Sequence, residues 1–386
     1  MIPQWTLSLE GGPRRVNHSA VIVDHRIFMF GGFCMGEDYA TLHAIDVHVL
    51  NTNSCRWMKI PTENTYKLKS EVPFMRYGHA SVAIEKNAFL FGGRNDILGA
   101  SACQGLYCFN TEHFKWSKVK VKGDIPCGRD GHAMCVANGN IYVFGGFEVD
   151  TNRFSNDLFM LDMSTLAWQR ISDEFNRCPS WRDFHTMTTC GDHIYVFGGR
   201  CNQHQSHYSQ LDEFYDNTLM VFDTKMKSWS AAVCSDLSLP PGRRSHSAFT
   251  YKHCLFIFGG FNSVVYEHFN DLWKYDPVES KWENVKTLGS SPTARRRQCC
   301  CLYEDQLFMF GGTSPKSETT QQTDDEEELF DHNDTNVLDF APTLKTLCFI
   351  VLLQYKVNLS SLPPILRWEA KVMSTPNSIS KPLLHG

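Results

Sequence analysis

Six Gly-Gly pairs divide this chain of 386 residues into similar segments, and each pair follows a short run of apolar residues. The first glycines of the pairs are Gly31, Gly92, Gly145, Gly198, Gly259 and Gly311. The steps between successive pairs are 61, 53, 53, 61 and 52 residues. A period of about 50 residues with a strand before each glycine pair is typical of a β-propeller, in which each repeat forms one four-stranded blade.

Two further marks repeat with the same period. An Arg-x-x-His motif precedes the apolar runs and begins at Arg15, Arg76, Arg129, Arg182 and Arg243. We interpret Arg296, with Cys299 in the histidine position, as the sixth copy. In five of the repeats, a second apolar segment follows the glycine pair and ends in Asp or Asn. A tryptophan stands six residues after that Asp or Asn, at Trp57, Trp116, Trp168, Trp229 and Trp282. Because the arginines and histidines recur in nearly every repeat, we interpret them as structural groups that hydrogen-bond between blades.

The sixth repeat lacks its own tryptophan, since Lys345 stands six residues after Asp339. A spare tryptophan, Trp5, lies near the N-terminus. We expect the segment around Trp5–Leu9 to supply the outer strand of the sixth blade, while the last repeat supplies its three inner strands. Such a mixed blade closes the ring and leaves no free sheet edge. The sequence therefore predicts an all-β, six-bladed propeller over residues 1–341.

Composition restricts the cellular location and the kinds of partner that we expect for this chain. The net charge of −5, without a basic tract, argues against direct nucleic-acid binding. The longest apolar run, Leu347–Leu353, is too short to cross a membrane. The 15 cysteines include three in a row, Cys299–Cys301, which indicates reduced thiols and a cytoplasmic and nuclear location. A polar insert at 314–328, which ends in an acidic run, is expected to be a disordered, solvated loop.

The sequence shows no pattern for catalysis. It contains no Gly-rich phosphate loop, no nucleophile elbow and no Cys-x-x-Cys metal knuckle. His204 and His207 lie three residues apart but have no partner at a matching spacing. We therefore expect a non-catalytic protein without a metal or a cofactor, and a propeller enzyme is the weaker alternative.

The segment after the propeller predicts two helices. Six apolar residues recur at helical spacing over about three turns: Leu344, Leu347, Cys348, Val351, Leu352 and Tyr355. The prolines that follow, Pro363 and Pro364, suit a turn and the first turn of a second helix. Such a helix pair could pack on the propeller or bind a partner.

The residue types in this segment resemble two known boxes. The elongin C-binding box has the pattern (Thr/Ser/Pro)-Leu-x-x-x-Cys-x-x-x-aliphatic, and it is matched by Thr343, Leu344, Cys348 and Leu352. The start of a cullin-2 box is matched by Leu362, Pro363 and Leu366. Together with the six repeats, which are of the kelch type, nearly the whole chain resembles the kelch-propeller substrate receptors of cullin-2–elongin B/C ubiquitin ligases. The insert at 314–328 departs from this resemblance.

The resemblance implies that the propeller and the C-terminal segment bind different partners. Residues 342–373 would hold elongin B/C and cullin-2, and the propeller would hold substrate proteins with C-terminal degrons, which often end in Gly. In a kelch propeller, the residues between each Arg and His and the residue after each glycine pair face one end of the ring. These positions vary between blades and include four arginines, Arg94, Arg200, Arg244 and Arg297.

We therefore predict a basic, degron-binding pocket at that end of the ring. The candidate residues are Tyr77, Arg94, Asp183, Phe184, Arg200, Arg244, Ser245, Arg297 and Gln298. A guanidinium group can bind a terminal carboxylate through two parallel hydrogen bonds. An aromatic wall that leaves no room for a Cβ atom would favour Gly at the end of the ligand.

The chain itself ends in Gly386, after a polar stretch that we expect to be flexible within a tail at 374–386. This tail could occupy the pocket of the same or another copy, which would be self-binding through Gly386. The alternative function is a non-catalytic kelch scaffold or adaptor that binds chromatin or cytoskeletal partners.

Overall fold

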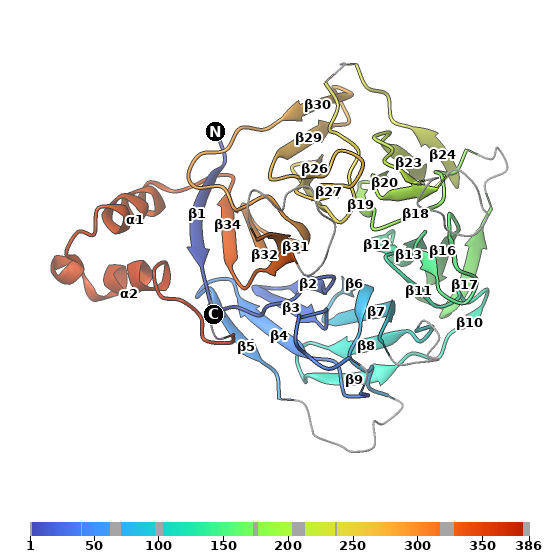
Figure 1. The fold of residues 1–386 in the computed structure, drawn as a ribbon, viewed down its shortest axis with the longest axis horizontal. Coiled ribbons are helices and arrows are strands. Elements are labelled where there is room, and N and C mark those ends of the chain that lie inside the picture. The colour runs from blue at the N-terminus through green and yellow to red at the C-terminus, as the bar shows by residue number, and fades with distance from the viewer. Residues whose placement is uncertain are drawn as a thin grey trace.

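The computed structural model describes residues 2–39, 41–61, 71–96, 103–172, 177–202, 213–235, 238–316 and 328–380. Six of its sheets form blades arranged as a ring around a central axis, three smaller sheets are hairpins beside the blades, and two helices lie on the outside of the ring (Figure 1). The chain is a six-bladed β-propeller followed by helices, as its repeat predicts.

Five blades are each built from four strands of one repeat, which run from the axis to the rim in chain order. The strands are β2 (Ser19–Val23), β3 (Arg26–Phe30), β4 (Val47–Asn51) and β5 (Arg56–Lys59) in blade 1; β6 (Tyr77–Ile84), β7 (Asn87–Arg94), β8 (Tyr107–Asn110) and β9 (Lys115–Lys118) in blade 2; β12 (Ala133–Ala137), β13 (Asn140–Phe144), β16 (Leu158–Asp162) and β17 (Ala167–Ile171) in blade 3; β19 (Thr186–Cys190), β20 (His193–Phe197), β23 (Met220–Asp223) and β24 (Ser228–Ala231) in blade 4; and β25 (Ser247–Tyr251), β26 (Cys254–Phe258), β29 (Leu272–Asp276) and β30 (Lys281–Asn284) in blade 5. A short strand, β10 (Lys122–Gly123), extends blade 3 by pairing in parallel with β17.

The sixth blade joins the two ends of the propeller. Its inner strands are β31 (Arg296–Tyr303), β32 (Gln306–Pro315) and β34 (Thr335–Asp339), and its outer strand is β1 (Gln4–Leu9). β1 pairs antiparallel with β34, and Trp5 lies opposite Leu338. The expectation that the N-terminal segment closes the ring is confirmed.

The insert in this blade begins later than the sequence suggests. Ser314 and Pro315 belong to β32, where they pair with Phe330 and Leu329 of β33 (Leu329–Asp331). These two residues were expected in the solvated loop, and that expectation is wrong because the strand continues past the glycine pair. Lys316 and Glu328 are joined by a backbone hydrogen bond at 3.0 Å, and the rest of the predicted loop between them, at 317–327, lies outside the described residues.

Six tryptophans pack in a closed cycle from blade to blade. Each one contacts a phenylalanine of the preceding blade, with ring centroids 5.0 to 5.9 Å apart. The pairs are Trp116–Phe30, Trp168–Phe91, Trp229–Phe144, Trp282–Phe197, Trp5–Phe258 and Trp57–Phe310. Trp5 therefore takes the place of the tryptophan that the sixth repeat lacks. Each aromatic pair adds about 0.5–1.5 kcal/mol to the gain from area burial.

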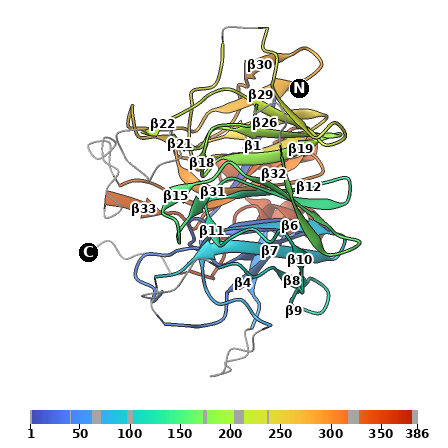
Figure 2. The ribbon, with the colours of Figure 1, turned by 90° about the vertical axis from the view of Figure 1, so that its right-hand side faces the viewer.

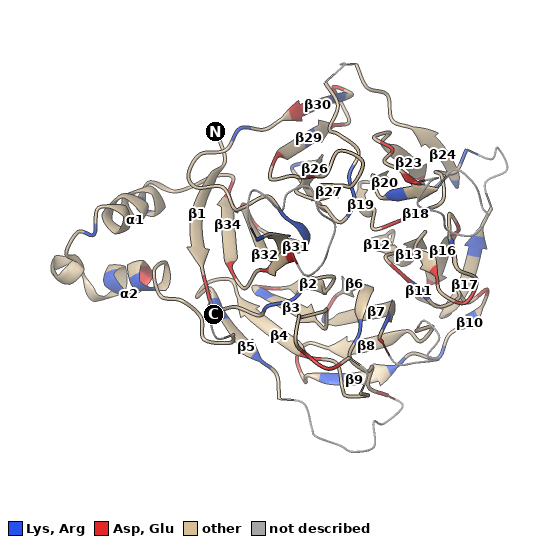
Figure 3. Cartoon of the chain, viewed as in Figure 1, with Lys and Arg blue, Asp and Glu red and all other residues tan. Residues whose placement is uncertain are grey.

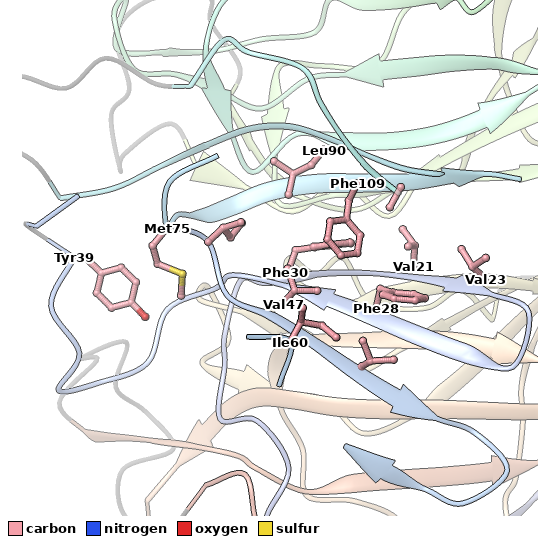
Figure 4. Close-up of a cluster of buried hydrophobic side chains, with 13 residues drawn as sticks. Val21, Val23, Phe28, Phe30, Tyr39, Val47, Ile60, Met75, Leu90 and Phe109 are labelled. Carbon is pink, nitrogen blue, oxygen red and sulfur yellow. The ribbon is translucent and has the colours of Figure 1, made fainter. Parts of the chain in front are cut away.

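Apolar side chains fill the space between neighbouring blades. In Figure 4, Phe28 and Phe30 of β3 lie between blades 1 and 2, close to Leu90 and Phe109. Phe30 and Phe109 meet at 5.6 Å between ring centroids, and both are almost fully buried. Aromatic and β-branched residues suit these strands because each sheet is covered on both faces.

The repeated arginine links two strands of its own blade. Nη1 of Arg129 donates to the carbonyl oxygen of Gly145 at 2.9 Å, and Arg182 does the same to Gly198. In the sixth blade, the residue that makes this bond is Arg295, which donates to Gly311 at 3.2 Å. The histidine position of that blade is then held by Gln298, whose Nε2 donates to the Phe258 carbonyl oxygen, as His79 does with Phe30.

Our interpretation of Arg296 and Cys299 as the sixth copy is therefore wrong by one residue. Three successive arginines, at 295–297, left the register open in the sequence. The hydrogen bond from Arg295 to Gly311 decides it, because Arg76, Arg129, Arg182 and Arg243 bond to the glycine 16 positions ahead in the same way.

The glycine pairs let the backbone of the next blade approach closely. The N–H of Gly199 donates to the carbonyl oxygen of Arg243 at 2.8 Å. A Cβ atom on Gly198 would lie only 2.4 Å from that same oxygen. Because real Cβ atoms do not come so close, no side chain fits at this position, and glycine is required there.

Around the axis, one residue from each blade joins a ring of backbone hydrogen bonds, which we call the axial belt. Each N–H donates to the carbonyl oxygen of the belt residue in the preceding blade, at 2.7 to 3.3 Å. The belt residues are Asn17, Gly78, Gly131, Phe184, Ser245 and Arg297. All six have positive φ angles, between 49° and 67°. The ring closes when Asn17 donates to Arg297, so the axial belt connects the first blade to the last.

The buried histidines next to the axial belt make stability depend on pH. Burial, reinforced by the charge of the neighbouring repeated arginine, lowers the pKa of His18, His132 and His246 to about 3. Between pH 6.5 and pH 3 the unfolded chain binds more protons than the folded chain, so the free energy of unfolding falls as the pH decreases. We expect His132→Gln, which copies Gln298, to reduce the loss of stability between pH 7 and pH 5 by about 2 kcal/mol.

Urea unfolding at the two pH values measures this difference. His113→Gln, which changes an exposed histidine, is the matched control and should keep the pH dependence of the unchanged chain. Equal pH dependence in the His132→Gln variant and the unchanged chain would contradict the prediction.

Candidate functional site

One end of the axis opens into a cavity of about 600 Å³, which we call the mouth cavity. Apart from Asp96, its walls come from the positions that the sequence predicts, namely the residues between each repeated Arg and His and the residue after each glycine pair. The lining residues are Val16, Asn17, Phe33, Tyr77, Arg94, Asp96, Asp130, Phe147, Asp183, Phe184, Arg200, Arg244 and Arg297. The two kinds of position are brought together by short antiparallel pairings, such as Tyr77 with Arg94 and Arg244 with Phe261.

Most of the predicted pocket residues line the mouth cavity. They are Tyr77, Arg94, Asp183, Phe184, Arg200, Arg244 and Arg297. Ser245 and Gln298 do not, since they line a second cavity of about 120 Å³, which shares Phe184 and Arg297 with the first. Ser245 is held there by the axial belt, and Gln298 by its bond to the Phe258 carbonyl oxygen.

Small hairpins extend the inner strands and surround the mouth cavity. Figure 2 shows β15, β22 and β33 projecting from the same side of the ring. The hairpin strands are β14 (Phe147–Glu148) and β15 (Arg153–Phe154) in blade 3, β21 (Arg200–Asn202) and β22 (Glu213–Phe214) in blade 4, and β27 (Phe261–Asn262) and β28 (Glu267–His268) in blade 5. β14 and β21 also pair with the short strands β11 (Arg129–Asp130) and β18 (Arg182–Asp183).

The charge of the mouth cavity is mixed, which corrects the prediction of a basic pocket. Four arginines share the lining with Asp96, Asp130 and Asp183. Figure 3 shows basic segments at β31 and acidic segments at β11 and β18 around the centre of the ring. The aspartates offset most of the positive charge of the arginines. The position of each charged side chain therefore matters more than the net charge of the cavity.

Two of the arginines are held by these aspartates. Arg200 donates through Nε and Nη2 to both carboxylate oxygens of Asp183, at 3.1 and 2.7 Å. Arg94 Nε lies 3.5 Å from Asp130, and it also donates to the Tyr77 hydroxyl at 3.2 Å. Burial raises the pKa of Asp130 to about 6, and Arg94 opposes this shift. The Arg200–Asp183 pair is a fixed part of the wall because both carboxylate oxygens are used.

Aromatic rings line the side of the mouth cavity formed by blades 1 and 2. Phe33 stacks on Tyr39 at 5.0 Å between ring centroids, and Tyr77 meets Phe33 edge-on at 5.8 Å. Arg244 belongs to blade 5 and lies over the ring of Phe261 at 5.4 Å. The cavity therefore has aromatic rings from blades 1 and 2, while Arg244 and Arg297 come from the neighbouring blades 5 and 6, and Arg297 adjoins Asn17 of blade 1.

Three charged residues at or next to this site are absent from the nine predicted candidates. Arg296 stands at the position of Arg244 in the sixth blade and lies 4.3 Å from the ring centroid of Phe261, but it is fully buried and does not line the cavity, and the shifted register hid its equivalence. Asp130 occupies a predicted position and could have been found from the repeat. Asp96, which accepts a hydrogen bond from the Tyr77 hydroxyl at 2.6 Å, lies in a loop without any repeat signal.

The described part of the chain holds no group of three or more His, Cys, Asp or Glu side chains placed to bind a metal ion. His204 and His207 lie outside that part. Within the same ranges, none of the helices is both long enough and apolar enough to span a membrane.

The C-terminal helices are α1 (Leu344–Gln354) and α2 (Pro364–Val372), joined through a 3₁₀ turn at Leu359–Ser361. Thr343 caps α1 by accepting a hydrogen bond from the N–H of Thr346, and Pro364 begins α2. Proline suits this first position because its missing N–H would have no partner there.

The two faces of α1 differ in exposure. Phe349 is buried and, with Leu7 of β1, lines a small cavity between the helices and the propeller. On the outward face Leu344 is 77% exposed, and Cys348 is exposed as well. The other matches to the two boxes divide between exposed residues, Thr343 and Pro363, and partly buried residues, Leu352, Leu362 and Leu366.

The segment after α2 is docked on the propeller, which corrects the prediction of a flexible tail at 374–386. We call residues 375–380 the C-terminal strap. Backbone N–H groups of Asn377 and Ile379 donate to the carbonyl oxygens of Glu10 and Gly11, at 2.7 and 2.8 Å. Residues 381–386, on which the predicted self-binding depends, lie outside the described residues.

Side chains add to the attachment of the C-terminal strap. The Asn377 side chain accepts from the Trp57 N–H at 3.0 Å and donates to the Cys55 carbonyl oxygen at 3.2 Å. Arg56 of β5 donates to the carbonyl oxygen of Thr375 at 2.6 Å. The helix pair is therefore attached to the ring at both ends, by β34 before α1 and by the strap after α2.

Comparison with known proteins identifies the family. The KLHDC2/KLHL20/DRC7 Kelch-repeats domain matches residues 78–312, more than half of the chain, so the chain belongs to the kelch-repeat family. It is similar over nearly its full length to kelch domain-containing protein 3: 47% identical to the Bos taurus protein over 387 residues and 46% identical to the human protein over 388 residues, covering 99% of this chain and 100% of each relative. Kelch domain-containing protein 10 of Xenopus tropicalis is 27% identical over 292 residues, which are 72% of this chain and 67% of that protein.

The close fit of the C-terminal strap against Gly11 predicts that a side chain at this position would displace the strap and lower the stability of the fold. This glycine has a φ of +83°, and a Cβ atom on it would lie 2.0 Å from the backbone oxygen of Asn377. We expect Gly11→Ala to release the strap, to speed hydrogen exchange at the amides of Asn377 and Ile379, and to lower the free energy of unfolding by about 2 kcal/mol more than a matched control.

Gly139→Ala is that control, because Gly139 has a φ of +74° and open space around its missing Cβ. Both variants place alanine in a left-handed conformation, and only the first collides with the strap. Similar losses of stability in the two variants would contradict the docked position of the strap.

Proposed function

We propose that the chain is the substrate-recognition subunit of a cullin-2–elongin B/C ubiquitin ligase, and that the mouth cavity binds C-terminal peptides that end in Gly. Elongin B/C would bind α1, and cullin-2 would bind the segment that begins at Leu362. The kelch family consists largely of non-catalytic binding proteins, which agrees with a receptor subunit that forms no covalent bond itself. Ubiquitin transfer would be accelerated because the receptor holds the substrate near the charged carrier enzyme.

The outward exposure of Leu344 and Cys348 on α1 carries the proposal. A helix that only completes the propeller would be expected to turn its apolar stripe inward. Instead, α1 is anchored by Phe349 on the inner face and leaves Leu344 and Cys348 exposed to solvent. An apolar, exposed pair at the spacing of the elongin C-binding box is what a docking helix needs.

The mouth cavity suits the end of a peptide chain. Its volume of about 600 Å³ lies in the range of ligand pockets. Arg244 and Arg297 lie on one side of it, where planar guanidinium groups can bind a terminal carboxylate. Phe33, Tyr77 and Phe184 provide aromatic surfaces that limit the space beside the last residue, which favours Gly.

The free energy expected from hydrogen bonds to the terminal carboxylate is sufficient for micromolar binding of a peptide. A hydrogen bond to a charged group contributes about 1.5–3 kcal/mol. Three or four such bonds, reduced by the cost of ordering the peptide, could provide about −8 kcal/mol, which corresponds to a micromolar Kd. Micromolar binding is sufficient for a receptor whose substrate must later be released.

Changes to the arginine side of the mouth cavity test peptide binding. We expect Arg297→Glu to weaken binding of a peptide that ends in Gly by at least about tenfold, because a carboxylate then faces the carboxylate of the ligand. Arg244→Gln, which removes the charge and shortens the side chain but keeps a polar end, should have a similar effect. Fluorescence anisotropy of a labelled peptide measures the affinity.

Two controls accompany this measurement. Lys281→Glu makes the same change of charge on β30, at the rim of the propeller, and should leave the affinity unchanged. A peptide with an amidated C-terminus lacks the carboxylate and should bind the unchanged chain poorly. Unaltered affinity in both arginine variants would contradict the proposal that Arg244 and Arg297 bind the terminal carboxylate of the peptide.

Substitutions on α1 test the connection to the ligase. We expect Leu344→Arg with Cys348→Ser to abolish co-purification with elongin B/C and to leave peptide binding unchanged, because the two surfaces are separate. The measurement is the amount of elongin C recovered with the chain after co-expression. Met226→Ser, which changes a residue that is 75% exposed on blade 4, is the matched control.

If elongin C fails to bind the unchanged chain, the ligase role is excluded, and the scaffold function becomes the better explanation. If elongin C binds equally to the α1 variant, its binding surface lies elsewhere on the chain.

A further inference from the structure

The hairpin of blade 5, whose base pairs with the cavity residue Arg244, carries an exposed apolar tip. The tip consists of Ser263, Val264, Val265 and Tyr266, between β27 and β28. Its last three side chains are 65%, 60% and 47% exposed. Three successive exposed apolar residues are unusual on a soluble surface and point to an interaction site.

The hairpin of blade 3 provides an internal comparison. It has the same length, and its tip residues are Val149, Asp150, Thr151 and Asn152. Asp150, Thr151 and Asn152 are exposed and polar, whereas blade 5 has Val264, Val265 and Tyr266 at the same places. The apolar character is therefore a property of blade 5 and not of this kind of hairpin.

Tyr266 stands in an unfavourable backbone conformation. Its φ is +51°, and the equivalent residue in blade 3, Asn152, has the same φ of +51°. Asparagine adopts this conformation readily, while a tyrosine is strained by it. Strain of this kind is found most often at functional sites, which supports a role for the tyrosine ring.

The tip is held rigidly next to the mouth cavity. The Asn262 side chain accepts a hydrogen bond from the Val264 N–H at 2.9 Å. Ser263 donates to the carboxylate of Glu213 in blade 4 at 2.8 Å, and Tyr215 donates to the same carboxylate oxygen at 2.7 Å. A surface fixed by bonds to a neighbouring blade loses little freedom when it binds a ligand.

The hairpin also connects the tip to the arginine side of the mouth cavity. Phe261, at its base, pairs with Arg244 through both backbone hydrogen bonds, at 2.9 and 3.0 Å. Val264 follows Phe261 by three residues, so the tip lies at most about 11 Å from Phe261, the backbone partner of Arg244. A peptide in extended conformation covers the same distance in three to four residues.

We propose that this tip is a second contact for the peptide, and that it selects ligands with an apolar side chain about three to five residues before the terminal carboxylate. The inference rests on the proposed function, because it assumes that the carboxylate lies near Arg244. The mouth cavity would then recognise the end of the chain, and the tip would distinguish between ends by the residues that precede them.

Labelled ten-residue peptides test this proposal. Each consists of Gly and Ser, ends in Gly, and carries a single Leu at one of the positions two to eight before the end. We expect Leu at about three to five residues before the end to increase affinity about tenfold over the peptide without Leu. The increase should disappear in a Val264→Asp, Val265→Thr, Tyr266→Asn variant, which gives blade 5 the tip residues of blade 3.

A second variant, Val264→Ser with Val265→Ser, removes the apolar surface without adding charge and should also lose the increase. Val278→Ser, which changes a valine that is 91% exposed in the turn between β29 and β30, should keep it. Both tip variants should bind the peptide without Leu as well as the unchanged chain does.

The outcomes separate the two proposals. If no peptide ending in Gly binds, the proposed function is overturned and this inference with it. If such peptides bind but Leu has no effect at any position, only the tip contact is overturned. A Leu effect that survives both tip changes, or an equal loss for all peptides, also overturns the tip contact.

Discussion

Contact between the backbones of neighbouring blades at the axis is the constraint on which the rest of the structure depends. The axial belt connects the six blades through N–H to carbonyl bonds, and it closes only when Asn17 of the first blade donates to Arg297 of the last. A second set of bonds joins the glycine pairs to the carbonyl of the next repeated arginine, such as Gly199 to Arg243. These contacts leave no room for a side chain at the glycines, and they place the belt residues at positive φ. The Gly-Gly pairs in the sequence are the visible consequence of this packing.

The same arrangement builds the candidate site. Because each blade ends at the axis with a short pairing between the residue after the repeated arginine and the residue after the glycine pair, variable side chains gather at one end of the ring. These positions hold different residues in blades that share one geometry, so this end can differ in chemistry while the ring stays the same. Here it carries an aromatic side, two arginine–aspartate pairs, and Arg244 with Arg297.

Attachment at both ends gives the C-terminal helices a fixed orientation. α1 follows directly from β34, Phe349 anchors its inner face, and the C-terminal strap returns from α2 to Glu10 and Gly11. A substrate receptor of the proposed kind would need such rigidity, because ubiquitin transfer depends on the distance between the bound substrate and the ligase. The N-terminal segment contributes twice, since β1 completes the sixth blade and the residues after it receive the strap.

The sequence by itself determined the number of blades, the closure of the ring through Trp5 and most of the residues around the mouth cavity, because each of these follows from a repeated spacing that local geometry imposes. Tertiary structure alone decided the register at Arg295–Arg297 and the position of Ser245 and Gln298 in the second cavity. It also decided the pairing of Arg200 with Asp183 and the docking of the C-terminal strap. In these cases the partner lies far away in the chain or in another blade, and no spacing along the sequence records it. A run of three arginines offers the same chemistry in each register, and only the hydrogen bond to the Gly311 carbonyl selects one of them.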